Sequence, residues 1–200
     1  MSGTYPSTPA PAAVTIESFE PSYKTTAHSL RRIVRSRGAQ RWMFVLKYTR
    51  LTRAEWATLF SWLMTQGGEG GSFTFYPPVF GDVQGTAAGS PKVKTTTAAG
   101  QTSIPSKGWT AGQTVLKAGD FLKFASHAKV YMATADVVAD GSGEATIALR
   151  PGLLSQVAAN EAITVSNVPF TCAVDGDTLE AEMMPAQRVQ LAELHLLEVP

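Results

Sequence analysis

The side chains that most often carry catalysis or bind metals are sparse in this sequence and lie far apart. The histidines, His28, His127 and His195, belong to three different segments, and none has a second metal ligand at a suitable spacing. For each, a packed or surface role and a functional role remain open. The single cysteine, Cys172, lies in an apolar segment typical of a buried thiol, with a nucleophile as the alternative. One cysteine cannot form an internal disulfide or a cysteine-cluster metal site.

Four carboxylates, Asp175, Asp177, Glu180 and Glu182, gather near the end of the sequence. The first two fit the start of an EF-hand calcium loop, but its later ligands do not follow at the required spacing. The tripeptide from Asp175 to Asp177, with glycine at its centre, is also typical of a hairpin turn. We therefore expect a turn here rather than a metal site or a catalytic carboxylate pair.

Two glycine-rich segments lack the context of nucleotide or nucleophile chemistry. Residues 67–71 follow no strand and precede no helix, unlike a dinucleotide-binding loop. Residues 141–143 are shorter than the five-residue nucleophile elbow, so both segments are expected to be turns. We expect no catalytic residue, no metal, no cofactor and no enzymatic activity. A cell-wall hydrolase would need a convergent polar site that the sequence does not display.

A run of arginines, at positions 31, 32, 35, 37 and 41, is the largest feature of one sign. On a hairpin its members alternate between the two faces. Nucleic-acid recognition is not expected, because it usually needs stacking aromatics and a basic domain, whereas this chain has a net charge of +1. A solvated face and a protein–protein face both remain open.

The charge is divided along the chain. Residues 1–85 carry nine basic and five acidic groups, and residues 166–200 carry one basic and six acidic groups. These ends can neutralise each other inside one fold or between neighbouring copies, since exposed charges act over about 8–10 Å. The candidate subunit-interface residues are Arg31, Arg32, Arg35, Asp175, Asp177, Glu180 and Glu182.

The composition indicates a folded chain without a membrane span. Apolar residues make up 44% of the 200 residues and charged residues 16%, and no apolar run approaches about 20 residues. The first dozen residues lack the basic start and apolar core of a secretory signal. We expect a soluble protein made in a reducing cytosol.

One helix is predicted over about residues 52–66. Thr52 and Glu55 have the spacing of a capping box, and two glycines follow residue 66. The candidate core face of this helix consists of Trp56, Leu59, Phe60 and Leu63, at helical spacing.

The rest of the chain has strand character. Residues 14–19, 29–37, 41–50 and 72–76 are expected strands, with a hairpin turn at residues 37–40 and one face of strand 41–50 formed by Trp42, Phe44, Leu46 and Tyr48. Residues 81–91 are typical of a linker. Beyond them, short strands at 92–97, 114–117, 121–124, 129–139, 144–150 and 162–165 predict a small antiparallel barrel or sandwich, with a hairpin turn at 118–120. Residues 170–174 and 178–183 follow as strands, and 188–199 fits a strand or a helix, with the strand favoured.

Two blocks of the sequence resemble a known family. They are RWMFVLKYTRLTRAEWATLFSWLMTQGGEGGSFTFYPP, at residues 41–78, and AGDFLKFASHAKVYMATADVVADGSGEATIALRPGL, at residues 118–153. The first resembles the distal tail proteins of siphophages, which form the hub of the tail. The second resembles a β-module found in many phage tail proteins.

The resemblance implies a mainly β fold, an antiparallel β-sandwich with one α-helix and an inserted small β-barrel-like, OB-like domain. The sandwich would comprise residues 14–85 and 166–200, and the insert residues 86–165. Independently of the resemblance, the Pro-rich and small polar composition at the N-terminus predicts a flexible or extended arm over residues 1–13. The family forms rings, commonly of six copies, at the distal end of the tail. Implied partners are further copies, the tail tube protein, and tail-tip, central-fibre or receptor-binding proteins. The implied location is the virion, after synthesis in the host bacterial cytoplasm.

A peripheral tail-tip module that binds a receptor or a glycan is the alternative. Small β-barrels often bind sugars, and Trp109 and Tyr131 could form a stacking platform. We expect Tyr131 in the core and Trp109 in a loop, with its exposure open.

Overall fold

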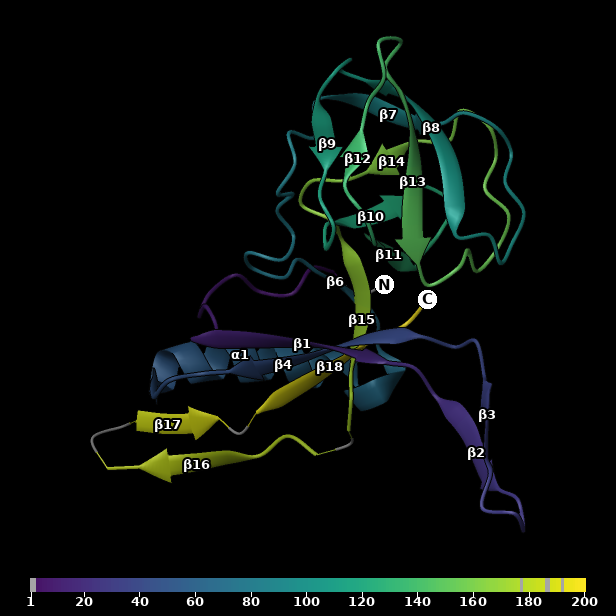
Figure 1. The fold of residues 1–200 in the computed structure, drawn as a ribbon. Helices are drawn as coiled ribbons and strands as arrows, with labels where there is room; N and C mark the ends of the chain where they lie inside the picture. Colours follow the sequence, from purple (N-terminus) through teal and green to yellow (C-terminus); the bar gives the residue numbers. More distant parts are fainter. Residues whose placement is uncertain (1–2, 177, 186–187, 192) are drawn as a thin grey trace. The chain divides into compact units, whose positions relative to one another are not determined.

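The computed structural model describes residues 3–200 except 177, 186, 187 and 192, and shows a mainly antiparallel β protein with one α-helix (Figure 1). Strands account for 44% and helices for 9%, so the predicted fold class is confirmed. The chain divides into two compact units, which we describe separately. Unit 1 contains residues 6–72 and 172–199, and unit 2 contains residues 3–5 and 73–171. The sequence placed the corresponding boundaries after residue 85 and before residue 166.

Unit 1 holds the α-helix, a main sheet, a smaller sheet that includes the β16–β17 hairpin, and the separate β2–β3 hairpin. Its elements are β1 (Ala13–Phe19), β2 (Ser22–Thr26), β3 (Arg32–Ser36), β4 (Arg41–Lys47), β5 (Leu51–Thr52), α1 (Arg53–Gln66), the 3-10 turn η1 (Gly68–Gly70), β16 (Ala181–Met184), β17 (Arg188–Leu191), β18 (Leu194–Glu198) and, from Cys172 onward, β15 (Phe170–Val174).

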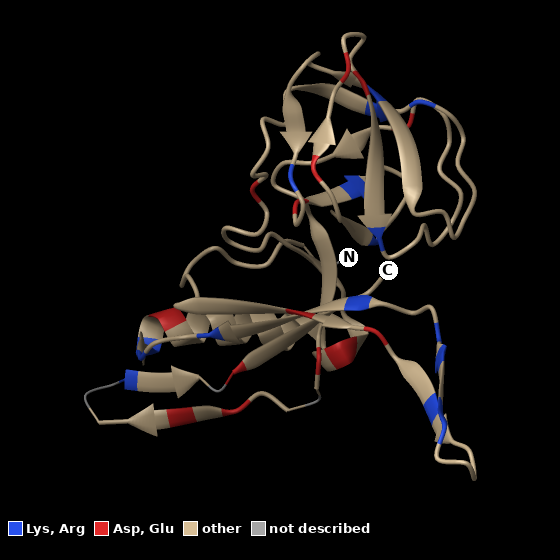
Figure 2. Ribbon diagram, in the orientation of Figure 1, with Lys and Arg blue, Asp and Glu red and all other residues tan. Residues whose placement is uncertain are grey.

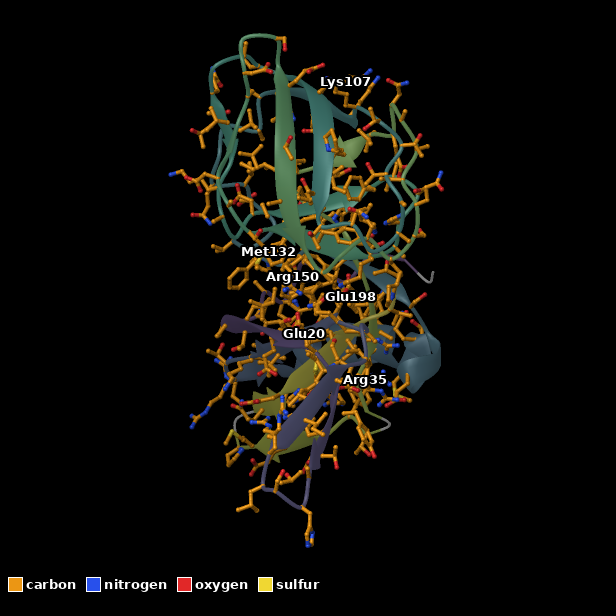
Figure 3. All side chains as sticks on the ribbon, turned by 45° about the vertical axis from the view of Figure 1, so that its right-hand side comes forward. Glu20, Arg35, Lys107, Met132, Arg150 and Glu198 are labelled. Atoms are coloured by element: carbon orange, nitrogen blue, oxygen red, sulfur yellow. The ribbon has the colours of Figure 1, made fainter. Side chains whose placement is uncertain are left out.

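The main sheet of unit 1 places β4 between β1 and β18, with β15 beyond β18. The predicted apolar face of β4 is confirmed, because all four of its large side chains are buried. Glu198 on β18, labelled in Figure 3, is also buried, and its Oε2 accepts a hydrogen bond from the backbone N–H of Trp42 at 3.2 Å. A second, smaller sheet has the order β16–β17–β5.

Helix α1 begins and ends where the local sequence predicts. Thr52 Oγ1 accepts from the Glu55 N–H at 3.3 Å, and Glu55 Oε2 accepts from the Thr52 N–H at 2.8 Å, which completes the capping box. Gly67 ends the helix in the left-handed conformation, at φ 69°. Of the predicted core face, Leu59 and Leu63 are buried, and the partly exposed Trp56 and Phe60 stack on each other at 4.9 Å.

The predicted hairpin between residues 29–37 and 41–50 is wrong. Strand β3 pairs with β2, which the sequence analysis did not identify, and β4 pairs with β1 and β18. The turn lies instead between β2 and β3, where the Ala27 N–H donates to the Arg31 carbonyl and Leu30 adopts φ 61°. Strand β2 lacked a signal because neither of its faces packs into a core, so it needs no apolar alternation.

Unit 2 consists mainly of a strongly curved sheet. Its elements are β6 (Phe73–Phe75), β7 (Gly89–Val93), β8 (Ser103–Trp109), β9 (Thr114–Leu116), β10 (Phe121–Phe124), β11 (Val130–Ala133), β12 (Val137–Val138), β13 (Glu144–Arg150), β14 (Ile163–Thr164) and the first two residues of β15.

Six of these strands form a nearly closed barrel in the order β14–β10–β11–β13–β8–β7. An isolated bridge between Lys92 and Ala162 joins the two end strands, and the Val93 N–H donates to the Glu161 carbonyl at 2.9 Å. The pairing of β11 with β13 places Met132 opposite Arg150 (Figure 3). The interior is apolar and includes Ile104, Leu122, Phe124, Tyr131 and Ile147, each 0% exposed.

The predicted hairpin between residues 114–117 and 121–124 is also wrong. Strand β9 pairs with β12, and β10 pairs with β11 and β14. In the turn between β9 and β10, Asp120 hydrogen-bonds both within the turn and to residues 84–85, which lie far away in the sequence. The Asp120 carboxylate, 2% exposed, accepts from the backbone N–H groups of Lys117, Gln84 and Gly85.

The N-terminal segment, expected to be a flexible or extended arm, makes backbone and ring contacts. Thr4 bridges to Thr74, and the Tyr5 N–H donates to the Thr74 carbonyl at 2.8 Å. The Tyr5 ring is buried beside Phe73 and Phe75, with centroid distances of 5.8 and 5.5 Å.

Candidate subunit-interface site

The β2–β3 hairpin is a concentration of unopposed positive charge. Residues 22–37 contain five lysines and arginines and no acidic residue. Arg31, Arg32 and Arg35, which the sequence singled out, are all exposed on this hairpin, and Figure 2 shows the positive charge along it. The register with β2 places Arg35 opposite Tyr23 and Arg32 opposite Thr26, so these two arginines lie on opposite faces, as alternation predicts.

The same hairpin exposes large apolar side chains. Tyr23 is 69%, Leu30 86%, and Ile33 and Val34 each 51% exposed. A two-stranded hairpin without a packed face is marginally stable in water. Exposed apolar side chains beside charged ones are typical of a surface that a partner covers. The geometry therefore favours a protein–protein face over a solvated one.

The acidic candidates lie around the β16–β17 hairpin. Glu180 and Glu182 are exposed, and Met183, which lies on β16, is 72% exposed. Asp175 lies at the end of β15, where its N–H donates to the His195 carbonyl at 2.9 Å. Asp177 lies outside the described residues, so the predicted turn cannot be followed through it. In the described part of the chain, β16 is an edge strand whose one neighbour is β17.

The β2–β3 and β16–β17 hairpins extend from different parts of unit 1 (Figures 1 and 2), and of the acidic candidates Asp175 lines a groove at the base of the basic hairpin together with Arg37 and Arg41. The ion pairs Lys47–Glu193, at 2.7 Å, and Lys94–Glu144 both lie outside the β2–β3 hairpin.

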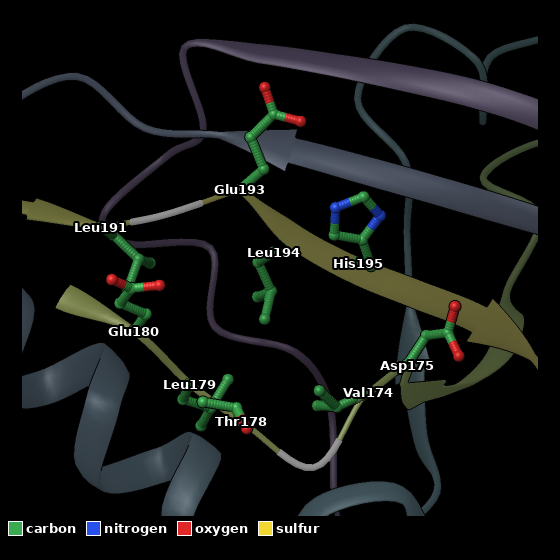
Figure 4. Close-up of a pocket in the computed structure, with 9 residues that line it drawn as sticks. All are labelled: Val174, Asp175, Thr178, Leu179, Glu180, Leu191, Glu193, Leu194 and His195. Atoms are coloured by element: carbon green, nitrogen blue, oxygen red, sulfur yellow. The ribbon is translucent and has the colours of Figure 1, made fainter.

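A small pocket of about 210 Å³ lies between β18 and the segment that leads into β16 (Figure 4). Leu194 points toward Val174, Leu179 and Leu191, while Glu193 points away from them. Asp175 and Glu180 contribute carboxylates to the lining. The hydrogen bond from Lys47 and its positive charge hold the pKa of Glu193 below its ordinary range. The pocket is thus apolar inside and acidic at its edges.

A wider groove of about 750 Å³ lies over β1, β4 and β18, at the base of the basic hairpin. Phe19, Met43 and Leu197 form its apolar lining. Its charged lining consists of two arginines, Arg37 and Arg41, and two carboxylates, Glu17 and Asp175. Phe19 is 53% exposed, so this groove extends the uncovered apolar surface of the hairpin onto the main sheet.

The groups that could do chemistry are not brought together at this site. His28 is exposed at the hairpin turn, His195 is exposed on β18, and Cys172 is fully buried in β15, as expected for a packed thiol. Within the described ranges, no group of three or more His, Cys, Asp or Glu side chains could hold a metal ion. The helix found there is not long and apolar enough to cross a membrane.

His127 takes part in a buried network in unit 2. Its Nδ1 lies 2.7 Å from the Tyr131 hydroxyl and its Nε2 lies 2.8 Å from Ser155 Oγ. The Tyr131 hydroxyl also accepts from the Leu154 N–H at 3.0 Å. The histidine therefore contacts a serine, but its other partner is a phenol hydroxyl that also accepts a hydrogen bond from the backbone. This geometry fastens the segment after β13 to β11.

The proposed stacking platform for a sugar is wrong. Trp109 is 5% exposed and belongs to β8 rather than a loop, and its Nε1–H donates to Ser106 Oγ at 2.8 Å. Tyr131 is fully buried, as expected. Neither ring can stack on a ligand from solvent.

Sequence reasoning missed the apolar half of the site. Tyr23, Ile33, Val34 and Met183 lie beside the predicted charges, but single exposed apolar residues carry no signal in a sequence. The missing signal was the absence of any core face over residues 22–36, which the strand prediction did not weigh. No protein-family model matches this chain, and no curated protein matches it.

Proposed function

We propose that this chain is a structural virion protein that assembles into a ring, commonly of six copies, at the distal end of a phage tail. There it would connect the tail tube to tail-tip, central-fibre or receptor-binding proteins. The two resembling blocks of sequence support the assignment to a tail, and the geometry of unit 1 supports the assembly into a ring.

The single observation that carries the proposal is the uncovered basic hairpin β2–β3, on the same unit as the exposed carboxylates Glu180 and Glu182 at the edge strand β16. An interface between two different patches is heterologous, and its repetition gives a closed ring or an open filament. Charge complementarity would fix which patches meet and speed their encounter. An enzyme is not proposed, because the histidines and the cysteine described above lie apart from one another and do not converge on one site. A glycan-binding module is not proposed either, because its candidate stacking residues, Trp109 and Tyr131, are buried.

The first experiment measures the mass of the purified protein by light scattering after size exclusion, with negative-stain images of the same peak. The proposal expects a ring of several copies with a central opening. Labelling of purified phage particles with an antibody against the protein should mark the distal tail end. Label along the capsid or on side fibres would contradict the tail-hub assignment.

A charge-reversed variant tests the role of the basic hairpin. Replacing Arg31, Arg32 and Arg35 together by glutamate should abolish the ring while the circular dichroism spectrum stays that of the parent, because these side chains are exposed. Lys92→Glu, an exposed cation in unit 2, is the matched control and should leave the ring intact. An unchanged ring in the triple variant would show that these charges do not contribute to assembly.

A further inference from the structure

We infer that strand β3 of one copy pairs edge to edge with strand β16 of the next copy, in an antiparallel arrangement that sets Arg35 opposite Glu182. This inference rests on the proposed ring and names the two strands through which neighbouring copies meet. A second copy of the chain is therefore the partner of the β2–β3 hairpin.

Both strands have a free edge in the described part of the chain. Strand β3 has β2 as its one neighbour, and β16 has β17. Peptide groups alternate between the two sides of a strand. Because the Arg37 N–H donates to the Pro21 carbonyl and the Arg31 carbonyl accepts from the Ala27 N–H, the odd-numbered residues of β3 turn toward β2. The peptide groups of the even-numbered residues face the free edge and can accept an added strand.

The charges select one antiparallel register. With Arg35 opposite Glu182, Arg37 lies opposite Glu180, so that both glutamates face an arginine on the same face of the sheet. Moving the register by one residue places neither glutamate opposite an arginine, and moving it by two residues in either direction keeps one of the two pairs.

The apolar residues agree with this register. Met183 then lies opposite Val34, and Met184 lies opposite Ile33. Met183, Val34 and Ile33 are 72%, 51% and 51% exposed in the single chain, so the pairing would cover apolar surface that nothing in the described residues covers. Cross-strand apolar and opposite-charge pairs both stabilise a sheet.

The same charges discriminate against pairing of like with like. Two β3 strands would bring arginines together, and two β16 strands would bring Glu182 against its counterpart, which is unfavourable for residues directly opposite each other. The pairing is therefore head to tail rather than two-fold symmetric, as a ring requires.

Engineered cysteines test the register directly. In the double variant Val34→Cys, Met183→Cys, the two side chains would be directly opposite, with Cα atoms about 5.5 Å apart, a separation that a disulfide can span. Mild oxidation should convert most of the protein into covalent multimers, which reductant returns to single chains. The native Cys172 is fully buried and does not compete.

Three variants serve as controls for the cross-link. Val34→Cys alone and Met183→Cys alone should give no ladder of multimers. The pair Ile33→Cys, Met183→Cys should cross-link at least about tenfold less than the first pair, because adjacent residues of a strand point to opposite faces. Equal yields from both pairs would overturn the register.

A charge exchange tests the same pairing without covalent chemistry. Arg35→Glu and Glu182→Arg should each raise the concentration needed for half-assembly by about tenfold or more, and the double variant should restore assembly. Failure of the double variant to recover would overturn the opposition of these two residues.

The outcomes separate this inference from the proposed function. Rings of the parent protein that yield no cross-link in the Val34→Cys, Met183→Cys variant would overturn the strand pairing and leave the ring standing. Efficient cross-linking into open filaments would support the pairing and contradict the ring. A parent protein that stays monomeric, with no cross-link in the variant, would overturn both.

Discussion

The buried carboxylate of Asp120 holds residues 84–85, which precede the first barrel strand β7, by hydrogen bonds. It is 2% exposed and accepts from three backbone N–H groups, those of Lys117 and Gln84 at 2.8 Å and of Gly85 at 3.2 Å. Asp120→Ala should therefore lower the free energy of unfolding by about 3 kcal/mol, because it leaves several donors without an acceptor. Denaturant unfolding followed by circular dichroism measures this change.

Asp136→Ala is the matched control for Asp120→Ala. Asp136 is exposed, and its carboxylate accepts from one backbone N–H, that of Ala118 at 2.9 Å. Its replacement should cost less than about 1 kcal/mol. Equal losses for the two variants would contradict the role of burial in the Asp120 contact.

Glu161 makes the stability of the barrel unit depend on pH. Partial burial raises the pKa of Glu161, but hydrogen bonds from Ser126 Oγ, Ser126 N and Ala158 N outweigh it and hold the pKa below the ordinary glutamate range. A carboxyl with a lowered folded-state pKa stabilises the fold above its unfolded pKa of about 4.3, and this contribution disappears as the pH falls through the folded value.

Glu161→Gln should accordingly be less stable than the parent at pH 7, and the difference should shrink as the pH falls from about 5 to 3. Denaturant midpoints measured across this range test the sign. Ser126→Ala, which removes one hydrogen bond to the carboxylate, should show the same trend with a smaller amplitude. A stability difference that grows on acidification would contradict the assignment.

Individual residues differed in how far the sequence could place them. The apolar face of β4 followed from its alternation alone. Trp109 was misplaced because Gly108 before it suggested a loop. Gly108 instead adopts φ 85° where a Cβ would lie 2.5 Å from the Ser90 carbonyl oxygen, so glycine marks a close approach of two strands here. Only the folded barrel creates that approach.

Helix α1 is the element whose ends are specified most locally. Thr52→Ala removes the N-cap hydroxyl and should lower the free energy of unfolding by about 1 kcal/mol. Thermal unfolding by circular dichroism checks this loss. Thr58→Ala, at an exposed position inside the helix, should leave stability unchanged or slightly raised, since alanine is the better helix former. A similar loss in both variants would show that the cap contributes nothing specific.

Many strand positions were predictable, but β2 and β8 were missed and the strand partners were not predictable. The capping box of α1 acts within four residues, and alternation identifies one strand at a time. Pairing joins distant segments: β4 meets β18 about 150 residues along the chain, with Phe44 opposite Leu196. Adjacent strands around the turns at residues 37–40 and 118–120 suggested hairpins, and in both places the main sheet or the barrel supplied other partners.

The charged half of the candidate site was predictable because a run of arginines and a run of carboxylates are visible in the sequence itself. Whether they neutralise each other inside one chain depends on where the two hairpins lie. The sequence left that question open because it did not identify β2, a polar strand without a core face. The pairing of β2 with β3 is set by the turn between them rather than by a core. Because the charged side chains of the two hairpins are exposed in unit 1, they are consistent with contacts between copies.

At the scale of the whole molecule, the near-neutral net charge of +1 conceals a strongly basic hairpin, β2–β3, and exposed carboxylates at Glu180 and Glu182, and an assembly that depends on them should be sensitive to salt. Screening lengths fall from about 8 Å at 0.15 M to about 3 Å at 1 M ionic strength. The average mass by light scattering should therefore fall as sodium chloride is raised over this range, at constant protein concentration. Apolar contacts are not weakened by salt. A mass that stays constant or rises would therefore indicate that apolar residues such as Val34 and Met183 stabilise the interface without a contribution from the arginines.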